Sequence, residues 1–143
     1  MELFSASKNE SSLPRPIRET LELIVGHGIK NDKFAGKDEN KAVMAVGKKA
    51  YEIAFKNGIN LELGSLGENI LLDFDPHLFE TGSLIYIGET QLQITEQCSV
   101  CNHLALFDQR LPELVKAHRG LYLKVLKGGK IRKDSTVYVK EKI

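Results

Sequence analysis

Short strand-like segments, separated by glycine-containing turns, dominate this chain and restrict the folds that it can adopt. The segments have alternating or β-rich residues, and they occupy Glu2–Ser7, Glu19–Val25, Lys41–Val46, Asn69–Asp73, Leu84–Ile87, Gln91–Thr95, Leu121–Leu126 and Thr136–Lys140. Gly88-Glu89 has the spacing of a hairpin turn, and Gly128-Gly129 is expected to turn the chain again. Helical patterns are limited to Lys48–Asn57 and Pro112–His118. We therefore expect a mainly β fold, a closed or half-closed β-barrel with a few short helices.

The length of the chain, 143 residues, is sufficient for one domain with its own core, so we expect a single domain over residues 1–143. Hydrophobic residues make up 42% and charged residues 27% of the chain, a mixture that argues against wholesale disorder. No apolar run is long enough to span a bilayer, and the first fifteen residues lack the pattern of a secretory signal. We therefore expect a cytoplasmic protein without a membrane partner; nothing in the sequence specifies an oligomeric state.

The net charge of +1 conceals an uneven distribution of charge along the chain. Residues 59–98 contain seven acids and no Lys or Arg, whereas residues 116–143 contain nine Lys or Arg and two acids. Residues 27–58 add seven Lys against four acids. A neutral total with basic segments favours a small anion site over a nucleic-acid duplex, which needs a dominant basic field. A solvated basic face is the alternative explanation of the same pattern.

The two cysteines, Cys98 and Cys101, follow a predicted strand at the point where it enters a loop. One of them could be a reactive or metal-ligating thiolate, activated by the basic C-terminal third. Their spacing also fits a redox pair, although the chain has no βαβ unit around it. A zinc site would require two more ligands, for which His103 and His118 are available at an unusual spacing. Alternatively, both cysteines are small buried apolar residues.

Two glycine-flanked segments have residues suited to binding a ligand. In the first, residues 64–69, two glycines allow a tight turn and a close backbone approach at the start of a strand. Glu68 and Asn69 would then offer an acceptor and an amide at the mouth of that strand, or Glu68 would simply cap the turn. The second segment, residues 28–36, could present Lys30, Asp32 and Lys33 to a ligand, or it could be an ordinary surface loop.

Several of these residues together resemble the MOSC domain, the family named for the C-terminal part of molybdenum cofactor sulfurases. The matching motifs are G-x-x-x-D-x-x-A-G at residues 28–36, G-E-N at 67–69, a cysteine after Ile94-Thr95, Arg119-Gly120, and V-L-K-G-G at 125–129. The resemblance extends from about Glu19 to Val139, and the small size resembles the stand-alone bacterial members of the family.

The resemblance implies a strand-rich barrel that binds the molybdenum cofactor in its pterin form, molybdopterin, in a basic and partly buried pocket. It implies that one cysteine carries sulfur or ligates molybdenum; Cys98 matches that position best and Cys101 less well. The pocket residues it implies are Asp32, Lys41, Glu68, Asn69, Arg119 and Lys127. Related enzymes reduce N-hydroxylated compounds with electrons from partner proteins. The expected activity is therefore a molybdenum-dependent reductase or a sulfur carrier, served by an electron- or sulfur-donor protein.

Three positions depart from the family pattern. Phe34 stands where many members have His, Lys41 where they often have Arg, and Gln97 where Pro often precedes the cysteine. Arg can bind a phosphate through two parallel hydrogen bonds and Lys cannot, so Lys41 is expected to change the affinity for an anion at this position. These differences favour an alternative function, a non-enzymatic ligand-binding or adaptor module that keeps the barrel without the chemistry.

Overall fold

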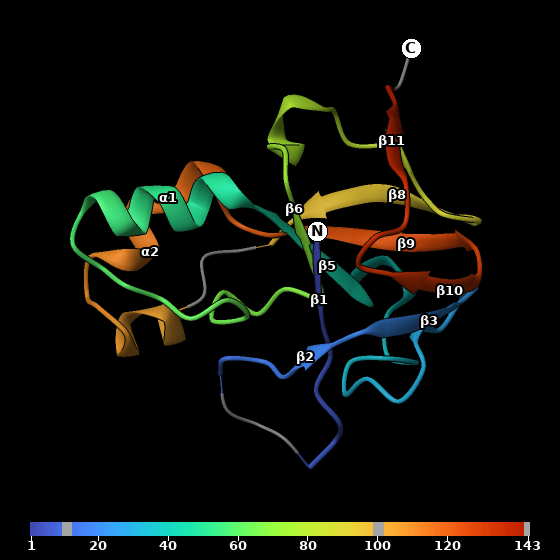
Figure 1. Cartoon of the computed structure of the whole chain (residues 1–143), viewed down its shortest axis with the longest axis horizontal. Coiled ribbons are helices and arrows are strands. Elements are labelled where there is room, and N and C mark those ends of the chain that lie inside the picture. The colour runs from blue at the N-terminus through green and yellow to red at the C-terminus, as the bar shows by residue number, and fades with distance from the viewer. Residues whose placement is uncertain (10–12, 99–101, 142–143) are drawn as a thin grey trace.

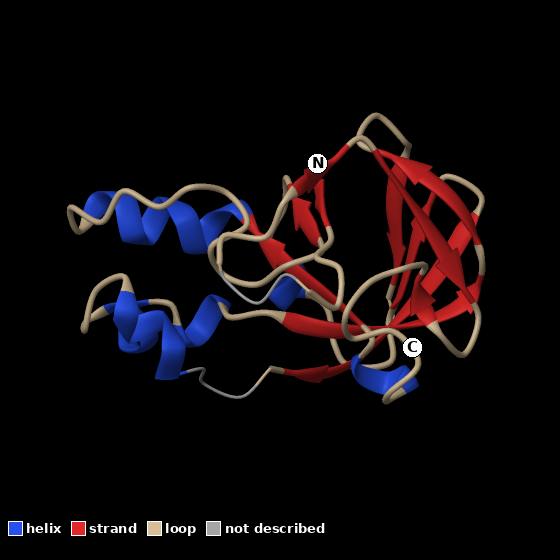
Figure 2. Ribbon diagram, turned by 90° about the horizontal axis from the view of Figure 1, so that it is seen from below, coloured by secondary structure: helices blue, strands red, loops and turns tan. Residues whose placement is uncertain are grey.

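The computed structural model describes residues 1–9, 13–98 and 102–141. Strands make up most of the regular structure, and the two α-helices lie together at one end of the molecule (Figures 1 and 2). α1 spans Lys48–Lys56 and α2 spans Leu111–Leu114. Single 3₁₀ turns occupy Glu39–Lys41, Pro76–Leu78, Asn102–Leu106 and Lys116–His118. The expected mainly β fold with a few short helices is confirmed.

The strands form two separate sheets. The larger sheet has eight strands in the order β11-β7-β8-β9-β5-β6-β1-β2. Their bounds are β1 Glu2–Phe4, β2 Ile17–Arg18, β5 Val43–Gly47, β6 Ile70–Leu72, β7 Leu84–Ile87, β8 Thr90–Gln97, β9 Leu121–Lys127 and β11 Val137–Lys140. The smaller sheet has the order β10-β3-β4, with β3 at Thr20–Ile24, β4 at Gly28–Ile29 and β10 at Gly129–Arg132.

The prediction of a barrel requires a correction, because the strands that the structure describes do not close into one. β2 and β11 lie at opposite edges of the larger sheet and do not pair. The predicted turn at Gly128-Gly129 does not fold β10 back onto β9; instead, β10 pairs with β3 from Gly129↔Leu23 onward. A side chain at Gly128 would lie 2.5 Å from the carbonyl oxygen of Leu23, so the glycine permits this close crossing between the sheets.

One crossover connection places β5 and β6 side by side in the larger sheet. β5 and β6 are parallel, and α1 connects them, as parallel neighbours require a crossover. The helix buries Ala50 and Ala54 in a small core with Phe4 and Leu111. As a result, residues 64–69, which lead from α1 into β6, lie beside the start of β5.

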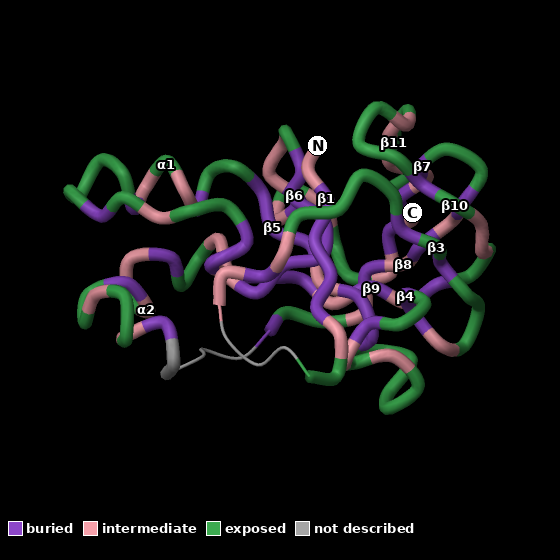
Figure 3. Tube along the Cα trace, turned by 60° about the horizontal axis from the view of Figure 1, so that its bottom comes forward, coloured by how far each residue is buried: buried purple, intermediate pink, exposed green. Residues whose placement is uncertain are grey.

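Buried residues on the strands of both sheets form the main core, and they are purple in Figure 3. Residues alternate across β9, so that Leu121, Leu123 and Val125 are buried there while Tyr122 and Lys124 lie on the other face. Full burial of a Leu or Val stabilises the fold by roughly 1.5–3 kcal/mol. Among the described residues, no helix has the length and apolar character needed to cross a membrane.

Candidate functional site

A cavity of about 740 Å³ lies beside β5 and β9, on the face of β9 that carries Tyr122. Loops far apart in the sequence form its other walls. Its lining residues are Ala6, Leu13, Arg15, Lys33, Phe34, Lys37, Asp38, Lys41, Ala42, Met44, Leu66, Gly67, Asn69, Leu106, Phe107 and Tyr122. The volume lies within the range of roughly 300–1,000 Å³ that is typical of small-molecule sites.

Strand register places two side chains in the cavity wall. Met44 on β5 and Tyr122 on β9 are direct cross-strand partners, and both point away from the main core. Gly120 lies next to this pair, and a Cβ there would come within 2.6 Å of the sulfur of Met44 and displace the end of that side chain. The Arg119-Gly120 motif therefore makes room for the cavity wall.

Three cations surround the ring of Phe34 at one end of the cavity. The guanidinium carbon of Arg15 lies 4.9 Å from the ring centre, and the ammonium groups of Lys33 and Lys37 lie 5.4 Å and 5.6 Å from it. Such contacts are favourable because the face of an aromatic ring is electronegative. This grouping of positive charge is the feature of the cavity that is most suited to an anion.

Arg15 is the most buried of these cations, with only 9% of its surface exposed. Burial lowers its pKa, because the charged form loses hydration, while Asp32 and Glu68 oppose this effect. Its Nη1 atom has no hydrogen-bond partner among the described residues. A buried guanidinium N–H without a hydrogen-bond acceptor is costly, and the ion pair with Asp32 Oδ1, 3.7 Å from Nη1, offsets part of this cost.

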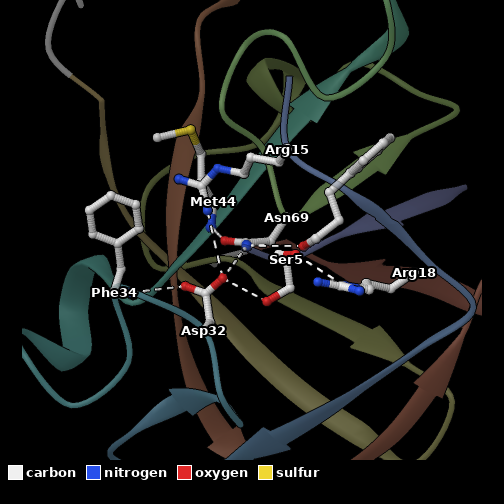
Figure 4. A network of polar contacts seen from close by, with 8 residues as sticks. Ser5, Arg15, Arg18, Asp32, Phe34, Met44 and Asn69 are labelled. Carbon is white, nitrogen blue, oxygen red and sulfur yellow. Dashed lines mark hydrogen bonds and ion pairs between the residues drawn. The ribbon is translucent and has the colours of Figure 1, made fainter. Parts of the chain in front are cut away.

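Asp32 lies behind Arg15 at the centre of a buried network (Figure 4). Its Oδ1 accepts hydrogen bonds from Ser5 Oγ at 2.8 Å and Asn69 Nδ2 at 3.3 Å, and lies 3.7 Å from Arg15 Nη1. Its Oδ2 accepts a hydrogen bond from the backbone N–H of Phe34 at 3.0 Å. Asp32 does not line the cavity. Instead, the carboxylate holds Arg15 and the Phe34 loop in place.

Asn69 lines the cavity, and its amide connects three segments. Its Oδ1 accepts a hydrogen bond from Met44 N at 3.0 Å, and its Nδ2 donates to the carbonyl oxygen of Phe4 at 3.1 Å as well as to Asp32. The amide therefore has a structural part in joining β1, β5 and the Asp32 network. Gly67, two residues earlier, has a φ of 85°, as the expected tight turn requires.

Glu68 lies between two cavity residues, but its own side chain is completely buried and does not line the cavity. Its Oε2 accepts a hydrogen bond of 2.6 Å from the hydroxyl of Tyr51 on α1. That hydroxyl in turn accepts the N–H groups of Gly64 at 3.0 Å and Leu66 at 3.4 Å. Burial raises the pKa of Glu68, and the Tyr51 hydrogen bond opposes the rise. Glu68 thus connects the turn to the helix.

Cys98 lies next to the cavity without lining it. Its side chain is buried, with 4% exposed, and its Sγ lies 3.5 Å from the hydroxyl of Tyr122, which lines the cavity. Its backbone N–H donates to the carbonyl oxygen of Gly120 at 2.8 Å. One side chain therefore separates the sulfur from the cavity. Cys101, the second cysteine named above, falls outside the described residues.

The three cations that the family resemblance implied for the pocket lie at different distances from the cavity. Lys41 lines it, and its ammonium group pairs with Glu96 at 3.3 Å. Arg119 does not line it and donates to the side chain of Gln97 at 3.0 Å. Lys127 is the last residue of β9, about 17 Å along the strand from Tyr122. The structure thus groups Lys41 with the cavity and places Lys127 at the other end of the strand.

Sequence reasoning missed several residues of the cavity, chiefly Arg15, Lys37, Met44 and Tyr122. Arg15 lies between two prolines in a loop with no periodic pattern, so no local signal indicated its burial. The outward position of Tyr122 does follow from the alternation along β9 and could have been deduced. Within the described part of the chain, no group of three or more His, Cys, Asp or Glu side chains is arranged to hold a metal ion.

Comparisons with known proteins agree with the fold and with the motifs. The model of the MOSC domain family matches residues 31–138. The solved structure of the YuaD protein from Bacillus subtilis is 16% identical and has a TM-score of 0.79, over 99% of this chain and 94% of that one. YiiM from Geobacillus stearothermophilus is 19% identical with a TM-score of 0.72, over 98% and 72% of the two chains.

A third structure, of a hypothetical protein, is 17% identical with a TM-score of 0.76; the match covers 99% of this chain and 66% of that one, so this chain spans about two thirds of its length. At these identities the structures establish the fold alone. No curated protein matches the chain. The family match, in contrast, extends from the loop after β4 to β11 and so includes most of the residues around the cavity. The chain therefore belongs to the MOSC domain family.

Proposed function

We propose that this chain binds the molybdenum cofactor, in its molybdopterin form, in the cavity beside β5 and β9. Membership of the MOSC family, which is associated with this cofactor, supports the proposal. The observation that carries it is the group of Arg15, Lys33 and Lys37 around Phe34 at one end of the cavity.

The residues of the cavity fit the chemical groups of this cofactor. Its phosphate requires cations, and the end of the cavity at Phe34 provides three. The pterin ring is planar and carries adjacent N–H donors, which suit a carboxylate such as Asp38 and flat walls such as Phe34 and Tyr122. Arg119, Lys127 and Glu68 do not line the cavity, so the proposal gives them no contact with the cofactor.

The proposed role of Cys98 is to supply a thiolate that ligates molybdenum or carries sulfur, because a soft thiolate suits such a centre. The Tyr122 hydroxyl at 3.5 Å accepts from the thiol, and after loss of the proton it would turn and donate to the thiolate. When bound, the cofactor supplies the two-electron chemistry that removes oxygen from an N-hydroxylated compound. An electron-donor protein would supply the two electrons for this reduction, whereas in the sulfur-carrier role a sulfur-donor protein would load Cys98.

A second candidate function is a ligand-binding module that uses the cavity and no thiol chemistry. The burial of Cys98 favours it, since the residue is 4% exposed and does not line the cavity. Under this alternative, the cations around Phe34 still bind an anionic ligand, and the thiol is a packing residue.

The decisive experiment is expression with a supply of the cofactor, followed by measurement of molybdenum and of pterin in the purified protein. The variants are Lys33→Ala/Lys37→Ala, Cys98→Ser and, as a control, Lys130→Ala, whose exposed side chain lies on β10 outside the cavity. The proposal predicts that the double lysine variant loses most of its pterin and that Lys130→Ala retains it.

The Cys98→Ser variant separates the two candidate functions. Loss of molybdenum with retention of pterin would support a thiolate ligand, whereas retention of both would favour the binding module. Negligible molybdenum and pterin in the wild type and all variants would contradict cofactor binding altogether.

A further inference from the structure

Three side chains close a ring of hydrogen bonds beside Cys98. Arg119 Nη2 donates to Gln97 Oε1 at 3.0 Å, Gln97 Nε2 lies 3.5 Å from His77 Nδ1, and His77 Nε2 lies 2.5 Å from the carbonyl oxygen of Arg119 itself. His77 comes from the 3₁₀ turn between β6 and β7, Gln97 ends β8, and Arg119 precedes β9. None of the three lines the cavity.

The chemistry of the groups assigns one role to each atom of the ring. A carbonyl oxygen only accepts, so His77 Nε2 carries a proton and donates to Arg119. A guanidinium only donates, so Gln97 turns its Oε1 toward Arg119 and its amide N–H toward His77. Nδ1 of a neutral imidazole then accepts from Gln97. The ring is therefore complete only when His77 is neutral, with its proton on Nε2.

The ring joins the two chain segments that flank the backbone hydrogen bond of Cys98. Gln97 directly precedes Cys98, and Arg119 directly precedes Gly120, whose carbonyl oxygen accepts from Cys98 N at 2.8 Å. β8 ends at Gln97, so Cys98 lies just beyond the last ladder pair that the described residues of β8 and β9 form. The end of a strand is the part most prone to local opening, and side-chain bonds across it oppose that opening.

Charged and titratable neighbours hold His77 from its other side. Asp75 Oδ1 accepts from the backbone N–H of His77 at 3.0 Å, and Asp75 Oδ2 lies 3.2 Å from His118 Nδ1. The ring of His118 packs edge-on against that of His77, with 5.9 Å between centres. The imidazole of His77 therefore lies between the Asp75–His118 pair on one side and Gln97 and Arg119 on the other.

We propose that Gln97, His77 and Arg119 are positioning residues that hold the backbone of Cys98, and thereby its thiol, against Tyr122 at the cavity wall. The functional value of this positioning rests on the proposed role of Cys98. The positioning itself is a property of the chain without cofactor and can be measured there.

The arrangement of donors and acceptors in the ring predicts that the ring depends on the protonation state of His77, which packing contacts alone would not predict. A second proton on His77 would place an Nδ1–H donor against the N–H donor of Gln97, and two donors cannot form a hydrogen bond. Rotating the Gln97 amide would not help, because its N–H would then face the N–H donors of Arg119. A doubly protonated His77 is therefore incompatible with the wild-type ring. Gln97→Glu has the opposite behaviour, because a carboxylate accepts from Arg119 and from a doubly protonated His77 but gains nothing from a neutral one.

The test is amide hydrogen exchange at Cys98, expressed as a protection factor so that the intrinsic effect of pH is removed. Gln97→Ala should lower the protection of Cys98 about tenfold. The matched control is Gln93→Ala on the same strand, which also loses one side-chain hydrogen bond, to Gly82 O at 3.3 Å, and should leave Cys98 unchanged. Nitrogen NMR of His77 should report the Nε2–H tautomer in the wild type.

The pH profiles decide the proposal. Protection of Cys98 should fall on acidification in the wild type and rise on acidification in Gln97→Glu. Unchanged protection in Gln97→Ala, an Nδ1–H tautomer in the wild type, or pH slopes of the same sign in wild type and Gln97→Glu would overturn it. All measurements use the cofactor-free chain, so failure to bind molybdenum would overturn the proposed function and leave this result unaffected.

Discussion

The guanidinium of Arg15 lies 3.7 Å from the carboxylate of Asp32, and both side chains are almost completely buried. The pair joins the loop before β2 to the loop after β4. Because each charge is removed from water, each depends on the other for compensation. This ion pair holds Arg15 at the cationic end of the cavity, and its contribution to stability can be measured without any ligand.

A double-mutant cycle should detect this dependence. Arg15→Met leaves Asp32 buried without its counter-charge, so we expect a loss of about 3 kcal/mol in the free energy of unfolding. Asp32→Asn should also destabilise the fold. In the double variant the losses should fall short of additivity by at least about 1 kcal/mol, as measured by urea unfolding. Strict additivity would mean that the two charges do not interact.

The stability of Glu68→Gln relative to the wild type should depend on pH. Burial raises the pKa of Glu68 in the folded chain above its ordinary value of 4.5, so the folded state holds this proton more tightly than the unfolded state does. The contribution of Glu68 to stability is thus greatest below pH 4.5 and declines as the pH rises toward the folded-state pKa. The side chain of Gln does not titrate, so the stability of Glu68→Gln relative to the wild type should increase as the pH rises.

Urea unfolding of both chains between pH 4 and pH 7 measures the direction of this shift. Glu52→Gln, at an exposed position on α1, is the control and should show no comparable trend. A shift in the opposite direction would indicate that the Tyr51 hydrogen bond, and not burial, dominates the pKa of Glu68.

Removal of a single hydroxyl from Tyr51 should weaken the turn before β6. Tyr51→Phe leaves the N–H groups of Gly64 and Leu66 without their acceptor and Glu68 without its donor. We expect a loss of about 2 kcal/mol in urea unfolding. Tyr86→Phe is the control, since that ring is stacked on Tyr138 at the surface and should tolerate the change. Equal effects of the two substitutions would contradict the role assigned to the Tyr51 hydroxyl.

Two glycines of the same turn should respond differently to substitution. Both have a positive φ, 95° at Gly64 and 85° at Gly67, so any side chain is strained there, and Gly67→Val should lower the melting temperature. A Cβ at Gly64 would also lie 2.7 Å from the carbonyl oxygen of Arg15, whereas at Gly67 the nearest atom is 4.0 Å away. Gly64→Ala should therefore be the more destabilising of the two alanine variants; the reverse order would exclude the close approach.

Local patterns predicted most elements of this fold and missed the two-residue strands β2 and β4 and the strand β10. Apolar residues recur at helical spacing in Lys48–Lys56, and β7 and β8 flank a glycine-containing turn. The bounds of these three elements were therefore predicted to within one or two residues. β2 and β4 have two residues each, too few for any period. β10 was missed because its partner, β3, is about a hundred residues earlier, and pairing at that distance leaves no local signal.

The same limit applies to the cavity. Motifs identified the segments that contain Asp32, Asn69 and Cys98, but not the direction in which their side chains point. Asp32 was expected to meet a ligand, and the structure turns it inward to hold Arg15. Burial depends on how loops pack in three dimensions, which the loop around Arg15, between two prolines, does not reveal in its sequence.

The cations of the cavity differ in how firmly they are bound into the fold. Arg15 is held by an acid inside the molecule, whereas Lys37 and Lys41 stand on the surface. An engineer could therefore change the affinity or selectivity of the cavity by exchanging these two lysines with little effect on folding. Exchanging Arg15 would require a compensating change at Asp32, so natural variation at these two positions should be coupled.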